Sequence, residues 1–526
     1  MPPSSSAAHL GEYDKLSDDQ TDNRLAPPLN RMLSNSASDL NQSNPVHFES
    51  FHDHVMDYHS RAALPAVMLQ RDQISVWSIL KHSIGKELSK ITMPVVFNEP
   101  LSFVQRLTEH MEYVDLIQRA ADCDDPVTRL EYIAAFSISA LAANRDRVAK
   151  PFNPLLGETF ELDCMEQLGF RMLVEQVSHH PPVSAFFAEG PVFRYQGSCY
   201  PKLRFYGRSI DVKPTGVNSL ELLDHNETYT WTNPSCSVHN LVMGKMYIEH
   251  HGVMEITNHK LGLTCVLTLK SGAGWFRTDA SHMEGFIVDK NKKKIRCLYG
   301  EWSDFLASCT VECFEQNFSS WGKEQREHRE KIKNQTELKP RSPPPQRRFS
   351  TTGLIDSSDD HGSQDGVAAV PLVHSKSTKL KKGSSTKNCT NLAHVTVLPV
   401  LKGSDILWRA KPRPPNSDQF YNFTAFAMML NDFDSDNPKH QCLPPTDSRR
   451  RPDMRFMEEG NIDSASAEKH RLEEKQRAAR NDRKKCKLEW FPLWFKTGKH
   501  PLTKEETWVF TGDYFKRDWS NCEDIF

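Results

Sequence analysis

The sequence predicts a mainly β fold with helices, organised around one large antiparallel sheet that closes almost into a barrel. Helical periodicity is confined to the region before Lys150 and to one segment near the carboxyl end, whereas side chains alternate with a period of two after Lys150. Turn residues recur between the alternating runs, as expected for an antiparallel meander. A sheet of this length must close or be covered because exposed edges aggregate, and a wide barrel leaves a ligand cavity inside.

Composition narrows the classes of function. The chain has 526 residues and a formal net charge of −2, so bulk nucleic-acid binding is not expected. Its 12 cysteines are scattered without a C-x-x-C pair or zinc-finger spacing, which is typical of reduced thiols in a cytosolic protein, and we expect no metal site and no cofactor. The amino terminus lacks a secretory signal, and the longest apolar run, around 133–143, is too short to span a bilayer. These features predict a soluble, cytoplasmic protein.

The amino-terminal region combines a tail with helices. Residues 1 to about 65 are polar with few clustered apolar side chains, which predicts a disordered tail. From Ile74 apolar residues recur at helical spacing, and a helix packed on the core explains this stripe on the sequence alone: Trp77, Leu80, Ile84 and Leu88. The ranges 101–119 and 127–147 repeat the helical period, with Asp125 and Pro126 marking the second start.

Strand-like alternation follows Lys150. It is clear at 160–164 and 202–206, and turn signals occur at 189–191, 214–216, 233–234 and 289–292. The ranges 406–408 and 421–424 are typical of further strands.

An insert interrupts the predicted sheet. Residues from about 337 to 391 are polar and proline-rich, which predicts a disordered loop within one domain spanning 66–526. A long polar helix is expected from Ser466 to about Lys487, and the aromatic residues after it predict a carboxy-terminal strap packed on the barrel.

Two groups of polar residues are candidates for binding an anion. Residues 175–182 read EQVSHHPP, and the two prolines hold the adjacent His179 and His180 extended, where each imidazole can donate a hydrogen bond. A turn with two surface histidines is the alternative. Lys469, Glu473 and Arg477 fall on one face of the predicted polar helix, which is equally the pattern of a solvated ion-pair face.

The octapeptide at 175–182 is similar to the signature of the oxysterol-binding-protein-related lipid-transfer family. Three more segments resemble family blocks: KPFNPLLGET at 150–159, ELSKITMPVVFNEPLSF at 87–103 and EKHRLEEKQR at 468–477. The resemblance extends over roughly 74–526 except for the insert.

The resemblance implies a non-enzymatic protein that carries a sterol or a phosphoinositide in one tunnel and exchanges them between cytosolic membrane faces. It implies that the apolar stripe is a lid over the tunnel, and that the phosphoinositide head group is bound by Lys150, Asn153, His179, His180, Lys469, Glu473 and Arg477. The implied partners are membrane surfaces at contact sites of the endoplasmic reticulum, endosomes or plasma membrane, bound peripherally and reversibly. Segments 12–14 and 48–53 are weakly similar to peptides that bind an endoplasmic-reticulum receptor, and both depart from that pattern.

Two other interpretations stand beside this one. A lipid sensor that recruits partners to membranes is compatible with the same residues. Catalysis by Ser178 and His179 is disfavoured because adjacent residues of an extended chain point to opposite sides, and the sequence has no G-x-S-x-G, H-E-x-x-H or phosphate loop.

The basic run at 480–487 either attracts an anionic leaflet or solubilises a helix end.

Overall fold

The structure is a computed structural model, and it describes residues 61–69, 93–242, 244–271, 281–317 and 400–526. These residues all belong to one compact unit, His54–Phe526. The expected lid stripe, the insert at 337–391 and the tail up to residue 60 lie outside the described residues. Of the expected tail, residues 61–65 are described: Leu64 is buried in the main core, and Arg61 pairs with Glu458 at 2.7 Å.

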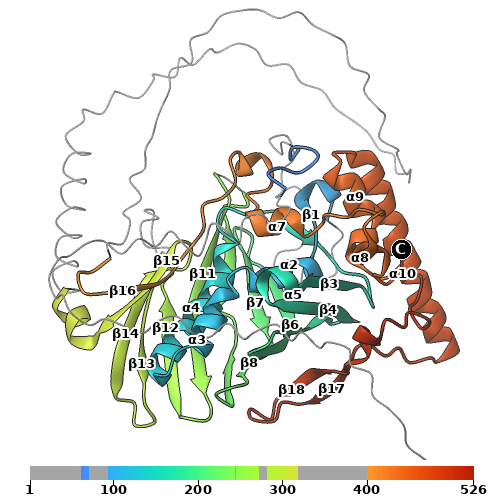
Figure 1. Cartoon of the computed structure of the whole chain (residues 1–526). Coiled ribbons are helices and arrows are strands. Elements are labelled where there is room, and N and C mark those ends of the chain that lie inside the picture. Colours follow the sequence, from blue (N-terminus) through green and yellow to red (C-terminus); the bar gives the residue numbers. More distant parts are fainter. Residues whose placement is uncertain (1–60, 70–92, 243, 272–280, 318–399) are drawn as a thin grey trace, which may run out of the picture. The chain divides into compact units, whose positions relative to one another are not determined.

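A 14-stranded antiparallel sheet dominates the described chain (Figure 1). Its strands are β3 (Thr159–Cys164), β4 (Phe170–His179), β5 (Pro182–Glu189), β6 (Phe193–Phe205), β7 (Ile210–Thr215), β8 (Asn218–Leu222), β9 (Glu227–Trp231), β10 (Ser235–His239), β11 (Tyr247–Asn258), β12 (Leu263–Leu269), β13 (His282–Val288), β14 (Lys294–Glu301), β15 (Phe305–Thr310) and β16 (Asp405–Arg409). The expectation of a mainly β fold around a large antiparallel sheet is confirmed. The pairing runs from β16 to β3, and no ladder between described residues joins these two ends.

The sheet is mostly a meander, but two long strands change partners along their length. Strand β6 pairs with β7 at one end and with β8 at the other, and β11 pairs with both β10 and β9. The turns predicted at 189–191, 233–234 and 289–292 fall between consecutive strands. Within the alternation predicted at 160–164, one position differs from expectation, because Glu161 is buried against Arg517.

Helices before the sheet cover part of it. These elements are η3 (Val95–Phe97), α2 (Phe103–Leu107), η4 (Thr108–Met111), α3 (Asp115–Ala121) and α4 (Pro126–Ala142). Helix α4 begins as predicted, with Pro126 in its first turn and the Asp125 side chain accepting from the Thr128 amide at 2.7 Å. It packs against β11, β12, β13, β15 and β16 (Figure 1).

The single helix expected at 101–119 is wrong. Residues 98–102 form a short strand, β1 (Asn98–Ser102), and Ser102 starts α2 through a capping box with Gln105. The Thr108 hydroxyl then donates to the Gln105 carbonyl at 2.7 Å, and the chain tightens into η4 before α3 begins. Local caps therefore break a segment whose apolar spacing is helical throughout.

Strand β1 pairs in parallel with β2 (Lys150–Phe152) and so fixes the start of the KPFNP loop. The fully buried Arg147, three residues earlier, donates to Glu99 at 2.7 and 2.8 Å and to Glu109 at 2.6 Å. A buried arginine satisfied by two carboxylates holds its segment firmly, because breaking such a pair leaves an uncompensated charge.

The carboxy-terminal part is largely helical. Its elements are η5 (Ser417–Gln419), α7 (Ala425–Met429), α8 (Pro438–Gln441), η6 (Ser448–Arg450), α9 (Pro452–Glu458), α10 (Ile462–Cys486), β17 (Phe495–Lys499), β18 (Glu506–Phe510) and η7 (Asp513–Lys516), and a short α5 (Met165–Leu168) joins β3 to β4. The strand expected at 421–424 is wrong, since Tyr421 and Asn422 have φ values of 58° and 57°, which a strand cannot contain. The polar helix predicted from Ser466 starts earlier, at Ile462, because Asn461 caps it by accepting from the Ser464 amide.

The segment after α10 packs on the sheet. The β17–β18 hairpin and the residues on either side of it bury Trp494, Phe495 and Tyr514 against Leu173, Val177 and Phe187 of β4 and β5. The Glu175 carboxylate accepts from the backbone amides of Leu493 at 3.0 Å and Trp494 at 3.1 Å. None of the helices in the described ranges is both long and apolar enough to cross a bilayer.

Candidate functional site

Two segments that are far apart in the sequence meet at helix α10: the loop after β2 and the tip of the β4–β5 hairpin. In the loop, the Lys150 ammonium donates to the Asn153 side-chain oxygen at 2.6 Å and to the Pro151 carbonyl at 3.3 Å. Lys150 is half-buried and Asn153 is exposed. The loop therefore presents one cation and one amide next to each other.

A buried ion pair fixes the shape of this loop. Glu158 accepts from the Leu155 amide at 2.8 Å and from Arg451 at 2.7 Å. Arg451 also donates to the Asn153 carbonyl at 2.9 Å and to Asp453 at 2.7 Å. Because each carboxylate and the guanidinium are hydrogen-bonded out of water, the loop is held in one geometry before any ligand arrives.

Helix α10 brings opposite charges to the same place. Lys469 pairs with Glu473 at 2.5 Å, one turn along the helix. The pKa of Lys150 is lowered to about 8, first by desolvation and then by the positive charge of Lys469, and Glu473 acts in the opposite direction. Lys150 therefore lies within electrostatic reach of this helix face, and the structure brings together Lys150, Asn153, Lys469 and Glu473.

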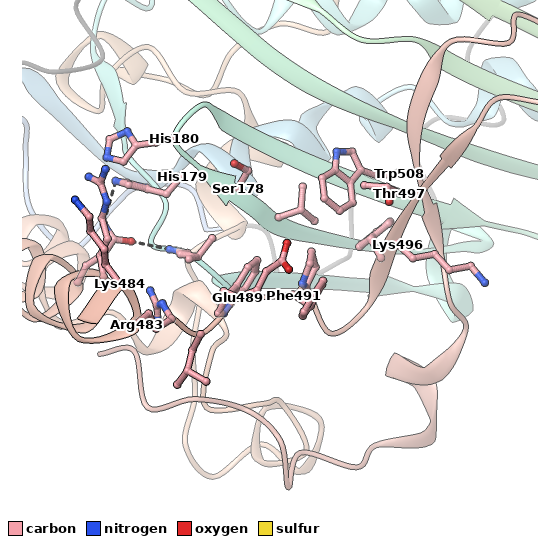
Figure 2. A pocket seen from close by; sticks show the side chains of 18 residues that line it. Ser178, His179, His180, Arg483, Lys484, Glu489, Phe491, Lys496, Thr497 and Trp508 are labelled. Atoms are coloured by element: carbon pink, nitrogen blue, oxygen red, sulfur yellow. Dashed lines mark hydrogen bonds between the residues drawn. The ribbon is translucent and has the colours of Figure 1, made fainter. Parts of the chain in front are cut away.

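The histidine pair is joined to α10 by one glutamine. Gln476 donates from its amide nitrogen to Nε2 of His179 at 3.1 Å, and its amide oxygen accepts from the Leu156 backbone at 2.7 Å (Figure 2). The Leu156 N–H needs an acceptor, which fixes the orientation of the amide. Nε2 of His179 is therefore an acceptor, and the ring is neutral with its hydrogen on Nδ1. The His180 ring lies next to it, with 4.6 Å between ring centroids.

Electrostatics agree with a neutral His179. Its pKa is lowered to about 4, chiefly by desolvation and further by His180 and Arg480. At this pKa His179 is neutral near neutral pH, so its ring carries a single N–H donor. A bound phosphate would have to supply the free energy that returns the proton.

Arg477 does not join the other candidates here. Its guanidinium is exposed and pairs with Glu474, three residues earlier on the same helix. Residue 476, rather than 477, continues the face that holds positions 469 and 473, since a helix repeats every 3.6 residues. For Arg477 to bind the head group as predicted, its side chain has to break the ion pair with Glu474.

Sequence reasoning missed Gln476, Glu158 and Arg451. For Gln476 a signal existed, because it lies seven residues after Lys469 and three after Glu473. For the ion pair no local signal exists, since Glu158 and Arg451 are 293 residues apart in sequence. In the described ranges no cluster of three or more His, Cys, Asp or Glu side chains is arranged to hold a metal ion.

Comparison with known proteins gives a consistent result. A family model described as "Oxysterol-binding protein" matches residues 75–519. Human oxysterol-binding protein-related protein 1 is 46% identical over 468 residues, which is 89% of this chain but 44% of that protein, so the chain spans less than half of that relative. Mouse oxysterol-binding protein-related protein 2 is also 46% identical, over 89% of this chain and 88% of that protein.

Two solved structures resemble the fold. The Osh1 ORD domain in complex with cholesterol aligns with a TM-score of 0.67 and 31% identity, covering 90% of this chain and 95% of that one. The Osh3 ORD in complex with PI(4)P from Saccharomyces cerevisiae aligns with a TM-score of 0.63 and 27% identity, covering 89% and 99%. From the family model and the identity to these relatives, we conclude that the chain belongs to the oxysterol-binding protein family.

Proposed function

We propose that this protein is a non-enzymatic intracellular lipid-transfer protein, which binds a sterol and a phosphoinositide in one tunnel and exchanges them between cytosolic membrane faces. The observation that carries the proposal is the convergence of Lys150, His179 and Lys469 from three distant segments. Solved relatives bound to cholesterol and to PI(4)P support both ligands. Packing alone does not explain why cations and donors gather at one surface.

The head group is held by these three segments. Lys150 and Lys469 place positive charges beside a phosphate of the head group, and Asn153 and the two histidines donate hydrogen bonds to it. Glu473 accepts hydrogen bonds from hydroxyls of the inositol ring and also orients Lys469. Arg477 joins as a planar multi-donor after it rotates away from Glu474.

The same tunnel takes the sterol, so the two ligands exclude each other. The tunnel lies within the nearly closed barrel, and the stripe Trp77, Leu80, Ile84 and Leu88 covers its mouth as a lid. Burying a lipid chain at roughly 0.8 kcal/mol per methylene makes spontaneous desorption slow, and a dry tunnel replaces the contacts that the chain leaves. The protein then lowers a barrier without making or breaking a covalent bond.

The domain organisation follows from the sequence pattern: a tail at 1–65, a lipid-binding domain at 66–526, and an insert at about 337–391. The protein acts in the cytoplasm and associates reversibly with endoplasmic reticulum, endosomal or plasma membrane contact sites. The weak acidic segments at 12–14 and 48–53 are candidates for binding an endoplasmic-reticulum receptor.

Lipid exchange between two populations of liposomes tests the proposal. Donor vesicles hold a fluorescent sterol and acceptor vesicles hold PI(4)P, and transport of both lipids is followed in opposite directions. We expect each protein molecule to move many lipids, with sterol flux rising when PI(4)P is present. Flux that stops at one lipid per protein would favour a sensor and overturn the proposal.

A matched variant isolates the head-group site. His179→Ala with His180→Ala removes two donors, each worth about 1.5 to 3 kcal/mol towards an ionised acceptor, so PI(4)P extraction should fall on the order of a hundredfold. Sterol extraction from vesicles without PI(4)P should be nearly unchanged because sterol has no phosphate. Equal loss of both ligands would indicate that the octapeptide is a structural turn.

A further inference from the structure

The two most exposed large apolar side chains of the described chain lie on the segment between α10 and β17. Leu488 is 65% exposed and Phe491 is 67% exposed, whereas the nearby Trp494 is buried against the sheet. Both exposed residues line one pocket of about 740 Å³, whose other walls are α10, β17 and the tip of the β4–β5 hairpin (Figure 2). Apolar side chains gathered at the rim of a pocket are typical of an interaction surface.

The same pocket is basic. Arg480, Arg483 and Lys484 of α10 and Lys496 of β17 line it, together with a single acidic residue, Glu489. Arg483 is paired with Glu523 at 3.5 Å, whereas Arg480 and Lys484, one helical turn apart, form no ion pair with any described residue. Two unpaired cations therefore stand beside two exposed apolar side chains.

We propose that this pocket and its rim dock the protein on an anionic bilayer. Leu488 and Phe491 enter the interface between head groups and acyl chains, and Arg480 and Lys484 contact lipid phosphates and carboxylates. This combination fits an anionic bilayer, because its head groups carry negative charge that can bind the cations and its acyl chains below them can bury the apolar side chains.

The position of the pocket fits this role. His179, His180 and Gln476 line the pocket and also belong to the candidate head-group site. Residues 477 and 484 are separated by about 10 Å along the helix, at 1.5 Å per residue. A bilayer docked here presents its head groups beside the site, and in this respect the inference rests on the proposed function.

Vesicle binding by the full-length protein tests the docking surface. The probe is phosphatidylcholine vesicles with or without phosphatidylserine, free of sterol and phosphoinositide, so that the tunnel ligands do not contribute. We expect cosedimentation with the anionic vesicles that weakens with added salt. Leu488→Ala with Phe491→Ala, and Arg480→Glu with Lys484→Glu, should each reduce the partition coefficient at least about tenfold.

Two control variants make the same chemical changes elsewhere. Val253→Ala with Leu261→Ala alters apolar side chains that are 56% and 42% exposed, on β11 and in the turn that follows it. Lys290→Glu with Lys292→Glu reverses the same number of charges at the exposed turn between β13 and β14. Both should bind vesicles like the parent. If the charge reversal at Lys290 and Lys292 lowers the partition coefficient as much as the reversal on α10, vesicle binding depends only on net charge and the inference is wrong.

The remaining outcomes also decide the matter. Vesicle binding unchanged in both pocket variants would overturn the inference. So would a change of molecular mass in solution on replacing Leu488 and Phe491, because the patch would then join copies of this chain. A parent that docks through the patch but moves no lipid would refute the proposed function while leaving the docking surface standing.

Discussion

At the scale of single residues, His179 links phosphate binding to protonation. In the neutral ring, Nε2 of His179 accepts a hydrogen bond from Gln476, and desolvation lowers the pKa of His179 to about 4. A charged ring has N–H groups at both positions, and an N–H cannot face the Gln476 amide nitrogen, which also donates. Full engagement of a phosphate by His179 therefore requires a proton and a change at Gln476.

The first prediction is the pH dependence of PI(4)P binding. If a dianionic phosphate raises the pKa of His179 in the complex, binding takes up a proton at any pH between about 4, the value of the free protein, and the pKa of the complex. Affinity should therefore fall as pH rises through that window. Calorimetry in buffers of different ionisation enthalpy should detect uptake of up to one proton, and His179→Asn should abolish it. Binding without any proton uptake at pH 5 to 7 would contradict this coupling.

The second prediction concerns Gln476 as a positioning residue. In Gln476→Glu, a carboxylate can accept from both the Leu156 amide and a protonated His179, so the loop stays attached while the pKa of His179 rises. The added negative charge faces the phosphate, so PI(4)P affinity should fall roughly tenfold even though the histidine is charged.

Nuclear magnetic resonance titration of His179 distinguishes this role from simple packing. Gln476→Leu, which removes both contacts, serves as the comparison and should leave His179 with its low pKa. An unchanged His179 titration in the glutamate variant would show that the two side chains do not interact in solution.

At the scale of elements, the octapeptide also holds the carboxy-terminal hairpin. Glu175, its first residue, is buried, and its two oxygens accept from the amides of Leu493 and Trp494. Desolvation raises the pKa of Glu175 to about 8 despite these amides, which lower it. Desolvation therefore destabilises the charged carboxylate of Glu175 by more than the backbone hydrogen bonds stabilise it.

The third prediction follows from this pKa and concerns stability. A carboxyl with a folded pKa of about 8 and an unfolded pKa near 4.5 binds its proton more tightly in the folded state, so its contribution to stability is present below 4.5 and is lost as pH rises through 8. Glu175→Gln cannot ionise, so its stability relative to the parent should increase by up to about 1.4 kcal/mol per pH unit across that window.

Urea unfolding at pH 5, 7 and 9 measures the difference. Glu166→Gln is the matched control, because Glu166 is exposed and its ion pair with Lys439 at 3.1 Å lies at the surface. A difference between the parent and Glu175→Gln that does not vary with pH would show that the carboxyl titrates normally.

The elements also show what sequence could and could not predict. Strands such as β6 and β16 were predictable because alternation and turn residues are local signals, and α10 was predictable from its polar composition and helical period. The turn at Tyr421 was not, since its left-handed backbone leaves no mark in hydrophobicity. Likewise, the family resemblance pointed to Lys150 and His179, but the ion pair and glutamine that position them depend on contacts made only after folding.

At the scale of the whole molecule, the chain leaves and re-enters the sheet at one place. Strand β15 ends at Thr310 and β16 begins at Asp405, yet they are antiparallel neighbours, with Ala307 opposite Ile406. The connection that contains the predicted insert therefore joins two adjacent points of the sheet. For a disordered insert, which the sequence predicts, length affects stability mainly through the entropy of closing a loop.

The last prediction is that residues 342–388 can be excised. Removal shortens the connection between β15 and β16 roughly by half, and halving a flexible loop changes the closure free energy by only about 0.6 kcal/mol. The free energy of unfolding should therefore stay within about 1 kcal/mol of the parent by urea titration, and sterol and PI(4)P exchange should proceed as before. A deletion of 405–408 is the control, and it should destabilise strongly because it removes Trp408, which is buried with its ring 5.5 Å from that of Tyr113. A comparable loss of stability on removing 342–388, or loss of exchange with stability retained, would show that the segment packs on the domain or takes part in transfer.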